Sequence, residues 1–228
     1  MLEIILQWTV PVWREAIEAA TRGGHTHVLR WAFEREGGRG PWTADFDDAL
    51  QIAATCGHLD VVKWLLERGV DGHTSWKMED SAPEYYELMW RHQYCIGQAL
   101  EMAAEHNQLD IVQVLYETQS MAGDACSTEP MDLAVTSGHL AVAQWLNHAK
   151  AQSCSVEAVD HAATNGHFEM LQWMHSTQQL KCTTAAMVGA AENGHFEIVK
   201  WFHRTQHARC SIYAVREAAD NGHLEPVC

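Results

Sequence analysis

The chain has 228 residues, and 47% of them are hydrophobic, which is enough for a continuous core in one large domain or one extended array. Its 15 Lys and Arg stand against 30 Asp and Glu, so the formal net charge of -15 disfavours binding to a nucleic-acid backbone. No apolar stretch reaches the roughly 18 residues that span a bilayer. Glu3 stands where a secretory signal carries a basic residue, and the seven Cys form no CxxC pair. We therefore expect a cytoplasmic protein that binds neither nucleic acid nor membrane.

Residues 1–15 are predicted to form a segment that caps whatever follows them. The apolar residues available for this contact are Trp8, Val10, Trp13 and Ile17. From residue 16 onward the chain repeats one phrase of sequence, which predicts a repeat architecture.

The repeated phrase runs through two small residues, two variable ones, Gly-His, an apolar residue, an acid, two aliphatics, a polar residue and Trp. Residues 53–64, 162–173 and 190–201 are near-identical copies. The Gly of the phrase, called the marker below, recurs at Gly24, Gly57, Gly138, Gly166, Gly194 and Gly222, with Asn107 in its place in one copy. The last three steps are 28 residues each. Five Cys share this register, each twelve residues before a marker: Cys95, Cys126, Cys154, Cys182 and Cys210.

Each unit is predicted to hold two helices. The first is rich in Ala and ends at the marker, because Gly adopts the left-handed conformation and Asn is its best substitute. Its start is capped by the Ser or Thr that follows the Cys: Ser127, Ser155, Thr183 and Ser211. The second helix opens with an acid, at Asp60, Asp110, Glu169 and Glu197. It continues with a core-facing stripe such as Val61, Val62, Trp64 and Leu65.

The whole chain, 1–228, is predicted to be a single array. Repeats fall at about 16–37, 45–69, 95–118, 126–149, 154–177 and 182–205, and a partial seventh covers 210–228 and stops before a second helix can form. Residues 70–94 interrupt the array with a polar run and, after Pro83, an aromatic-rich stretch. We expect a loop followed by a short helix lying across the stack. A role in binding and a plain packing role both stay open for this insertion.

The phrase AAxxGHLxVVxWL resembles the ankyrin repeat, and this resemblance covers residues 16–225 with one interruption. It implies an all-α fold, an ankyrin-type solenoid of helix-turn-helix repeats. The 28-residue step, the Trp and the Cys-Thr-Thr-x-Ala-Met start at 182–187 are similar to a short, Trp-containing ankyrin-like subclass. Segments between units, such as 176–181, lack the hairpin sequence of the family, so we expect short loops in place of β-hairpins.

The resemblance also implies a function, which is non-enzymatic binding of another protein. In ankyrin stacks, the residues just before the marker line the concave face. The concave lane of this chain is Thr55, Glu105, His106, Thr136, Ser137, Thr164, Asn165, Glu192 and Asn193. This lane is polar and partly acidic, so it suits a partner protein with a basic or polar surface. We expect the chain itself to be a monomer. It has no aromatic anchor, which leaves open a structural spacer, or a fragment of a larger multidomain ankyrin protein whose activity lies elsewhere.

No motif predicts a catalytic, cofactor or metal site. A P-loop, a dinucleotide glycine pattern, a nucleophile elbow and an HExxH helix are all missing from the sequence. The Cys series fits small buried residues, because equivalent positions of stacked helices lie too far apart for disulfides. The set His92, Cys95 and His106 has one metal-like spacing but no second tight pair. The His that follows each marker is expected to make a local hydrogen bond at the turn.

Overall fold

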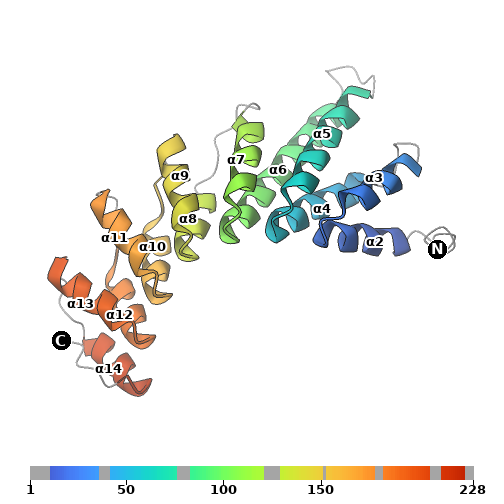
Figure 1. The fold of residues 1–228 in the computed structure, drawn as a ribbon. Helices are drawn as coiled ribbons and strands as arrows, with labels where there is room; N and C mark the ends of the chain where they lie inside the picture. Colours follow the sequence, from blue (N-terminus) through green and yellow to red (C-terminus); the bar gives the residue numbers. More distant parts are fainter. Residues whose placement is uncertain are drawn as a thin grey trace. The chain divides into compact units, whose positions relative to one another are not determined.

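The computed structural model describes residues 11–35, 42–75, 83–120, 129–150, 153–177, 182–205 and 212–223. Within these ranges the regular elements are α-helices and there is no β-strand (Figure 1). The chain divides into two compact units, Met1–Cys126 and Ser127–Cys228. None of the helices in the described ranges is both long and apolar enough to cross a bilayer.

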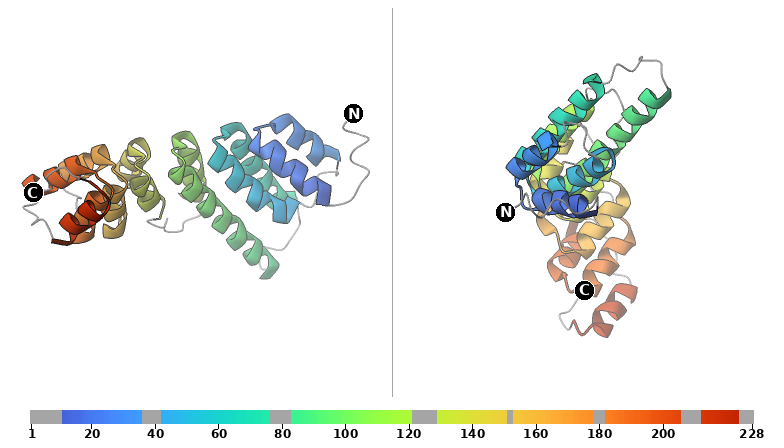
Figure 2. Two further views of the ribbon diagram at one scale, coloured as in Figure 1. Left: turned by 90° about the horizontal axis from the view of Figure 1, so that it is seen from below. Right: turned by 90° about the vertical axis from the view of Figure 1, so that its right-hand side faces the viewer.

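The described residues of unit 1 form three helix pairs. The first helices of the pairs are α2 (Pro11–Arg22), α4 (Trp42–Cys56) and α6 (Pro83–Glu105). The second helices are α3 (Thr26–Arg35), α5 (Leu59–Ser75) and α7 (Leu109–Ser120). First helices pack on first helices and second helices on second helices, so the unit has two layers (Figure 2).

Unit 2 repeats this arrangement with shorter helices. Its first helices are α8 (Glu129–Thr136), α10 (Val156–Thr164), α12 (Thr184–Glu192) and α14 (Ile212–Asp220). Its second helices are α9 (Leu140–Lys150), α11 (Phe168–Ser176) and α13 (Phe196–Thr205). The first helices form one continuous layer, and α9, α11 and α13 each pack against the first helix that precedes them.

The marker residues end the first helices as predicted. All six marker glycines have a positive φ, and Asn107 has φ 59° in the copy without Gly. Around Gly166, the His167 N–H donates to Ala162 O at 3.0 Å and the Gly166 N–H to Ala163 O at 3.2 Å. This pair of bonds satisfies the last carbonyl groups of the helix, and it requires the left-handed residue that the marker provides.

The predicted helix starts are confirmed wherever the structure describes them. Ser155 Oγ accepts the Ala158 N–H at 3.1 Å, and Thr183 Oγ1 accepts the Ala185 N–H at 3.0 Å. Ser127 and Ser211 lie outside the described residues. The first turns of the second helices contain the predicted acids Asp60, Asp110, Glu169 and Glu197.

Small residues fill the space between first helices. Ala162 and Ala163 of α10 and Ala190 and Ala191 of α12 are fully buried, which lets these helices approach closely. On the second helices the predicted stripe of α5 is also buried. The Trp of this stripe is buried to different extents in different repeats. Trp64 is 4% exposed, whereas the equivalent residues are half-buried: Trp31, Trp145, Trp173 and Trp201.

Two predicted helix boundaries are wrong. The aromatic-rich part of segment 70–94 does not form a separate helix across the stack, because α6 runs unbroken from Pro83 to Glu105 and α5 extends to Ser75. Proline is favoured at a first helical position, and no further Pro interrupts α6. Because proline is favoured at a first helical position, α2 begins at Pro11. Trp13 and Ile17 therefore belong to the first repeat and not to a separate capping segment. Trp8, Val10, the polar run 76–82 and the predicted loop 178–181 lie outside the described residues.

Candidate protein-binding surface

The residues predicted to form the concave lane lie at the ends of the first helices. Thr55, Glu105 and His106 belong to unit 1, where they precede the turns after α4 and α6. The six lane residues of unit 2 form pairs at the ends of α8, α10 and α12: Thr136, Ser137, Thr164, Asn165, Glu192 and Asn193. Since these three helices pack side by side, the pairs form one row within unit 2.

Several lane side chains are engaged in hydrogen bonds with the backbone. Thr164 Oγ1 donates to Asp160 O at 2.9 Å, and Asn193 Nδ2 donates to Gly189 O at 3.0 Å. Asn165 Nδ2 reaches the preceding repeat, where it donates to Thr136 O at 3.0 Å. Glu192 is exposed. The lane therefore combines polar groups fixed by the helices with an exposed carboxylate.

The ring of the His after a marker contacts the marker of the preceding repeat at His58, His167, His195 and His223, where a local hydrogen bond was predicted. His58 Nε2 lies 2.8 Å from Arg22 O, and a Cβ atom added at Gly24 would be 2.7 Å from His58 Nδ1. In unit 2 a Cβ at Gly166 would lie 2.6 Å from the His195 ring. At Gly24, Gly138, Gly166 and Gly194 glycine is thus required for two reasons, the positive φ and the imidazole that packs on the Cα atom.

The environment of His167, the His that follows Gly166, alters its titration. Burial lowers the pKa of His167, because removal from water disfavours the charged imidazolium. Its hydrogen bond with the Thr136 backbone acts in the opposite direction, while the neighbouring His139 and His195 add to the lowering of the pKa. The neutral form of His167 is therefore favoured in the folded unit.

Two aspartates join repeats in a way that the sequence reading missed. Asp132 Oδ1 accepts the Ser155 N–H at 2.7 Å, and Asp160 Oδ1 accepts the Thr183 N–H at 2.8 Å. Asp160 also accepts the hydroxyl of Thr183, the residue that caps α12. Each Asp stands six residues before a marker and 23 residues before its partner, a pairing that could have been found from the spacing.

These aspartates also affect the cysteine series. Burial, with the nearby Asp132 carboxylate, raises the pKa of Cys154 to about 11. Burial and Asp160 raise the pKa of Cys182 in the same way. Cys95 is buried, as predicted, whereas Cys154 and Cys182 are only half-buried. Cys154 and Cys182 are free thiols, and so is the exposed Cys56. Among the residues that the structure describes, no three His, Cys, Asp or Glu side chains are placed to hold a metal ion.

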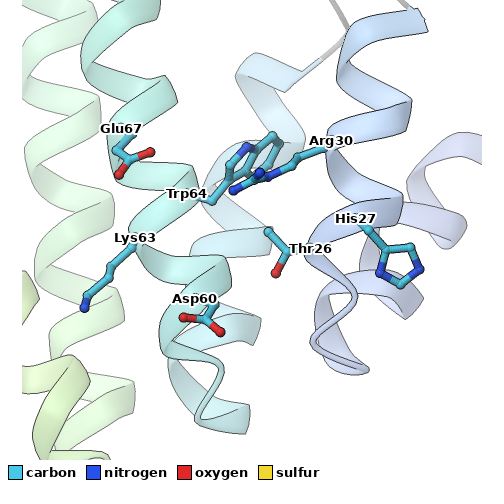
Figure 3. A pocket seen from close by; sticks show the side chains of 7 residues that line it. All are labelled: Thr26, His27, Arg30, Asp60, Lys63, Trp64 and Glu67. Carbon is cyan, nitrogen blue, oxygen red and sulfur yellow. The ribbon is translucent and has the colours of Figure 1, made fainter.

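A pocket of about 410 Å³ lies in unit 1 between the second helices α3 and α5 (Figure 3). Its lining is Thr26, His27, Arg30, Asp60, Lys63, Trp64 and Glu67. Charged side chains of both signs surround the opening, and Trp64 is the buried member. This pocket was not predicted from the sequence.

Comparison with known proteins identifies two segments of the chain. The model described as "Ankyrin repeat" matches residues 47–74, and the model described as "Ankyrin repeats (many copies)" matches residues 100–146. No curated protein matches the chain. The matched segments contain Gly57 in one case and Asn107 and Gly138 in the other, which are markers of the structural repeat.

These matches agree with the helix pairs, the left-handed marker turns and the Ala-rich first helices of both units. They do not address the short Trp-containing subclass, which remains a prediction. Repeat sequence and repeat structure together support an ankyrin-repeat family for this helical solenoid.

Proposed function

We propose that this protein binds a partner protein through the concave lane. Ankyrin repeats are generally protein–protein interaction modules. The observation that carries the proposal is the row in unit 2, where three consecutive first helices present pairs of polar residues side by side.

The sizes of the packed side chains support the choice of this face. Alanines separate neighbouring first helices, whereas Phe and Trp side chains stand between neighbouring second helices such as α11 and α13. Small residues bring one layer together and large residues spread the other, so each stack should bend with its first helices on the inside. The lane would then lie on the inner face of each unit.

Charge supports the choice of partner. The lane contains two acidic residues, Glu105 and Glu192, and its one basic residue is His106. The chain as a whole has a formal net charge of -15. Such a surface favours encounter with a basic or polar protein surface and disfavours an acidic one. The chain is proposed to act as a monomer, which light scattering coupled to size-exclusion chromatography would test.

The function can be tested by partner capture from native lysate followed by mass spectrometry. The lane variant carries Glu105→Arg and Glu192→Arg, one change in each unit. The matched control carries Glu117→Arg and Glu169→Arg, which make the same change of charge on the second helices α7 and α11. Equal helicity by circular dichroism is required of all three proteins.

We expect a protein that the wild type and the control retain and the lane variant loses. Retention by all three proteins would place the binding surface elsewhere. If the wild type captures nothing specifically, the structural-spacer alternative is favoured over a binding module.

A further inference from the structure

In unit 2 the groove between the second helices α11 and α13 is filled by aromatic side chains of the chain itself. Trp201 of α13 lies edge-on against two rings of the preceding second helix, α11. Its ring centroid is 5.7 Å from that of Phe168, at 80°, and 5.4 Å from that of His175, at 76°. Phe168 stands two residues after its marker and His175 nine residues after it.

In the equivalent groove of unit 1 the position of Phe168 is occupied by a smaller, non-aromatic residue. Trp64 of α5 takes the place of Trp201, and Phe33 of α3, nine residues after its marker, contacts it edge-on at 6.0 Å and 89°. The residue two positions after this marker is Thr26, where the other described repeats have Leu or Phe: Leu59, Leu109, Leu140, Phe168 and Phe196. A missing large side chain at Thr26 therefore accounts for the pocket between α3 and α5.

We propose that this pocket binds an aromatic side chain of a partner polypeptide, which takes the place that Phe168 occupies in unit 2. Edge-to-face contact with Trp64 would stabilise the bound ring as it does in the α11–α13 groove. In Figure 3 the Arg30 side chain extends toward the Trp64 ring, so the entering ring displaces its exposed end. Arg30 can then lie over the bound ring as a cation.

The charged side chains around the opening of the pocket favour a peptide as the source of that ring. Arg30 and Lys63 offer hydrogen-bond donors, whereas Asp60 and Glu67 offer acceptors. A polypeptide main chain has N–H donors and C=O acceptors on either side of a buried side chain. It can therefore hydrogen-bond with the donors and with the acceptors around the opening. The two carboxylates disfavour a phosphate-rich ligand in the same place.

This pocket is separate from the concave lane, because it lies between second helices whereas the lane lies at the ends of first helices. The proposal therefore does not rest on the lane. A partner could contact either surface alone.

The test uses the full chain and two peptides, Ac-Ala-Ala-Phe-Ala-Ala-NH2 and the matched penta-alanine. Nuclear magnetic resonance follows the indole N–H of Trp64, assigned with a Trp64→Phe variant. Thr26→Phe supplies the missing ring from the chain itself, and Thr26→Val keeps the size of the original side chain. Circular dichroism confirms that both variants retain the helical content of the wild type.

The Phe peptide should shift the Trp64 resonance with a Kd of about 1 mM, as expected for a small ligand. Thr26→Val should bind it equally well, and Thr26→Phe at least about tenfold more weakly because its ring fills the pocket. No shift with the Phe peptide, an equal shift with penta-alanine, or unchanged binding to Thr26→Phe would each overturn the proposal.

Discussion

Units 1 and 2 are built from the same turn and the same small residues, yet they join their repeats differently. In unit 2 carboxylates of α8 and α10 accept backbone N–H groups from the next repeat, and His rings pack on the marker glycines. In unit 1 the helices α4 and α6 are linked by Gln51 Nε2, which donates to Gln98 Oε1 at 2.6 Å. In the same unit Gln108 takes the place of the His ring on Gly57, whereas His58 packs on Gly24 as the His rings of unit 2 do on their glycines.

This difference separates two kinds of position in the repeat. Glycine at the marker and alanine on the first helix are dictated by backbone conformation and close approach, so both units have them. The residues that connect one repeat to the next only have to be complementary to each other. They can be Asp with Ser, Gln with Gln, or His with Gly, and the two units are free to differ.

The largest stability effect is expected at the marker glycines. Gly166→Ala should lower the free energy of unfolding by about 3 kcal/mol, the sum of a left-handed Ala and a clash with His195. Gly222→Ala should cost only about 1 kcal/mol, because φ is also positive there but nothing lies within 4 Å of the added Cβ. Chemical denaturation measures both values. Equal losses would show that the His ring contributes nothing to the requirement for glycine.

The next effect is on thiol reactivity. Cys154 should react with a thiol reagent about 100-fold more slowly at pH 8 than a cysteine of pKa 9, because its pKa of about 11 depletes the thiolate. The exposed Cys56 of unit 1 is the internal comparison, read out by mass spectrometry of labelled peptides. Asp132→Asn should speed the labelling of Cys154, and an unchanged rate would exclude the carboxylate as a cause.

The aspartate links of unit 2 should have graded effects on stability. Asp160→Ala removes the acceptor of both the Thr183 N–H and its hydroxyl, and should cost about 2 kcal/mol. Asp132→Ala removes the acceptor of the Ser155 N–H, and should cost about 1 kcal/mol. Thermal or chemical unfolding compares the two variants. A larger loss for Asp132→Ala would contradict the assignment of the stronger link to Asp160.

The smallest effect concerns pH. Since burial lowers the pKa of His167, the unfolded chain binds more protons than the folded unit once the pH falls below about 6.5, and stability declines there. His167→Gln, which copies the residue found at Gln108 of unit 1, should make the decline between pH 7.5 and pH 5.5 shallower. Melting temperatures at these two pH values test the slope, with the exposed His148→Gln as the control. Identical slopes in wild type and His167→Gln would contradict this origin.

The sequence predicted what depends on one residue and its local backbone. Gly at a left-handed turn, Ser155 at a helix start and the aliphatic stripe of α5 each act within their own repeat. It did not predict the bond from Asp132 to Ser155, because that contact depends on how one repeat is placed on the next. The pocket beside Thr26 was missed because it arises from a side chain that is too small, and the continuity of α6 because the repeat register suggested a start at Cys95.

The packing of His on Gly has a consequence for how such a protein can change in length. Removing residues 154–181, which is 28 residues, would bring His195 into the place of His167 over Gly138. Thr183 would take the place of Ser155 opposite Asp132. The new junction has the same chemistry as the old one, so a whole repeat can be duplicated or lost in a single genetic event without a new interface having to evolve.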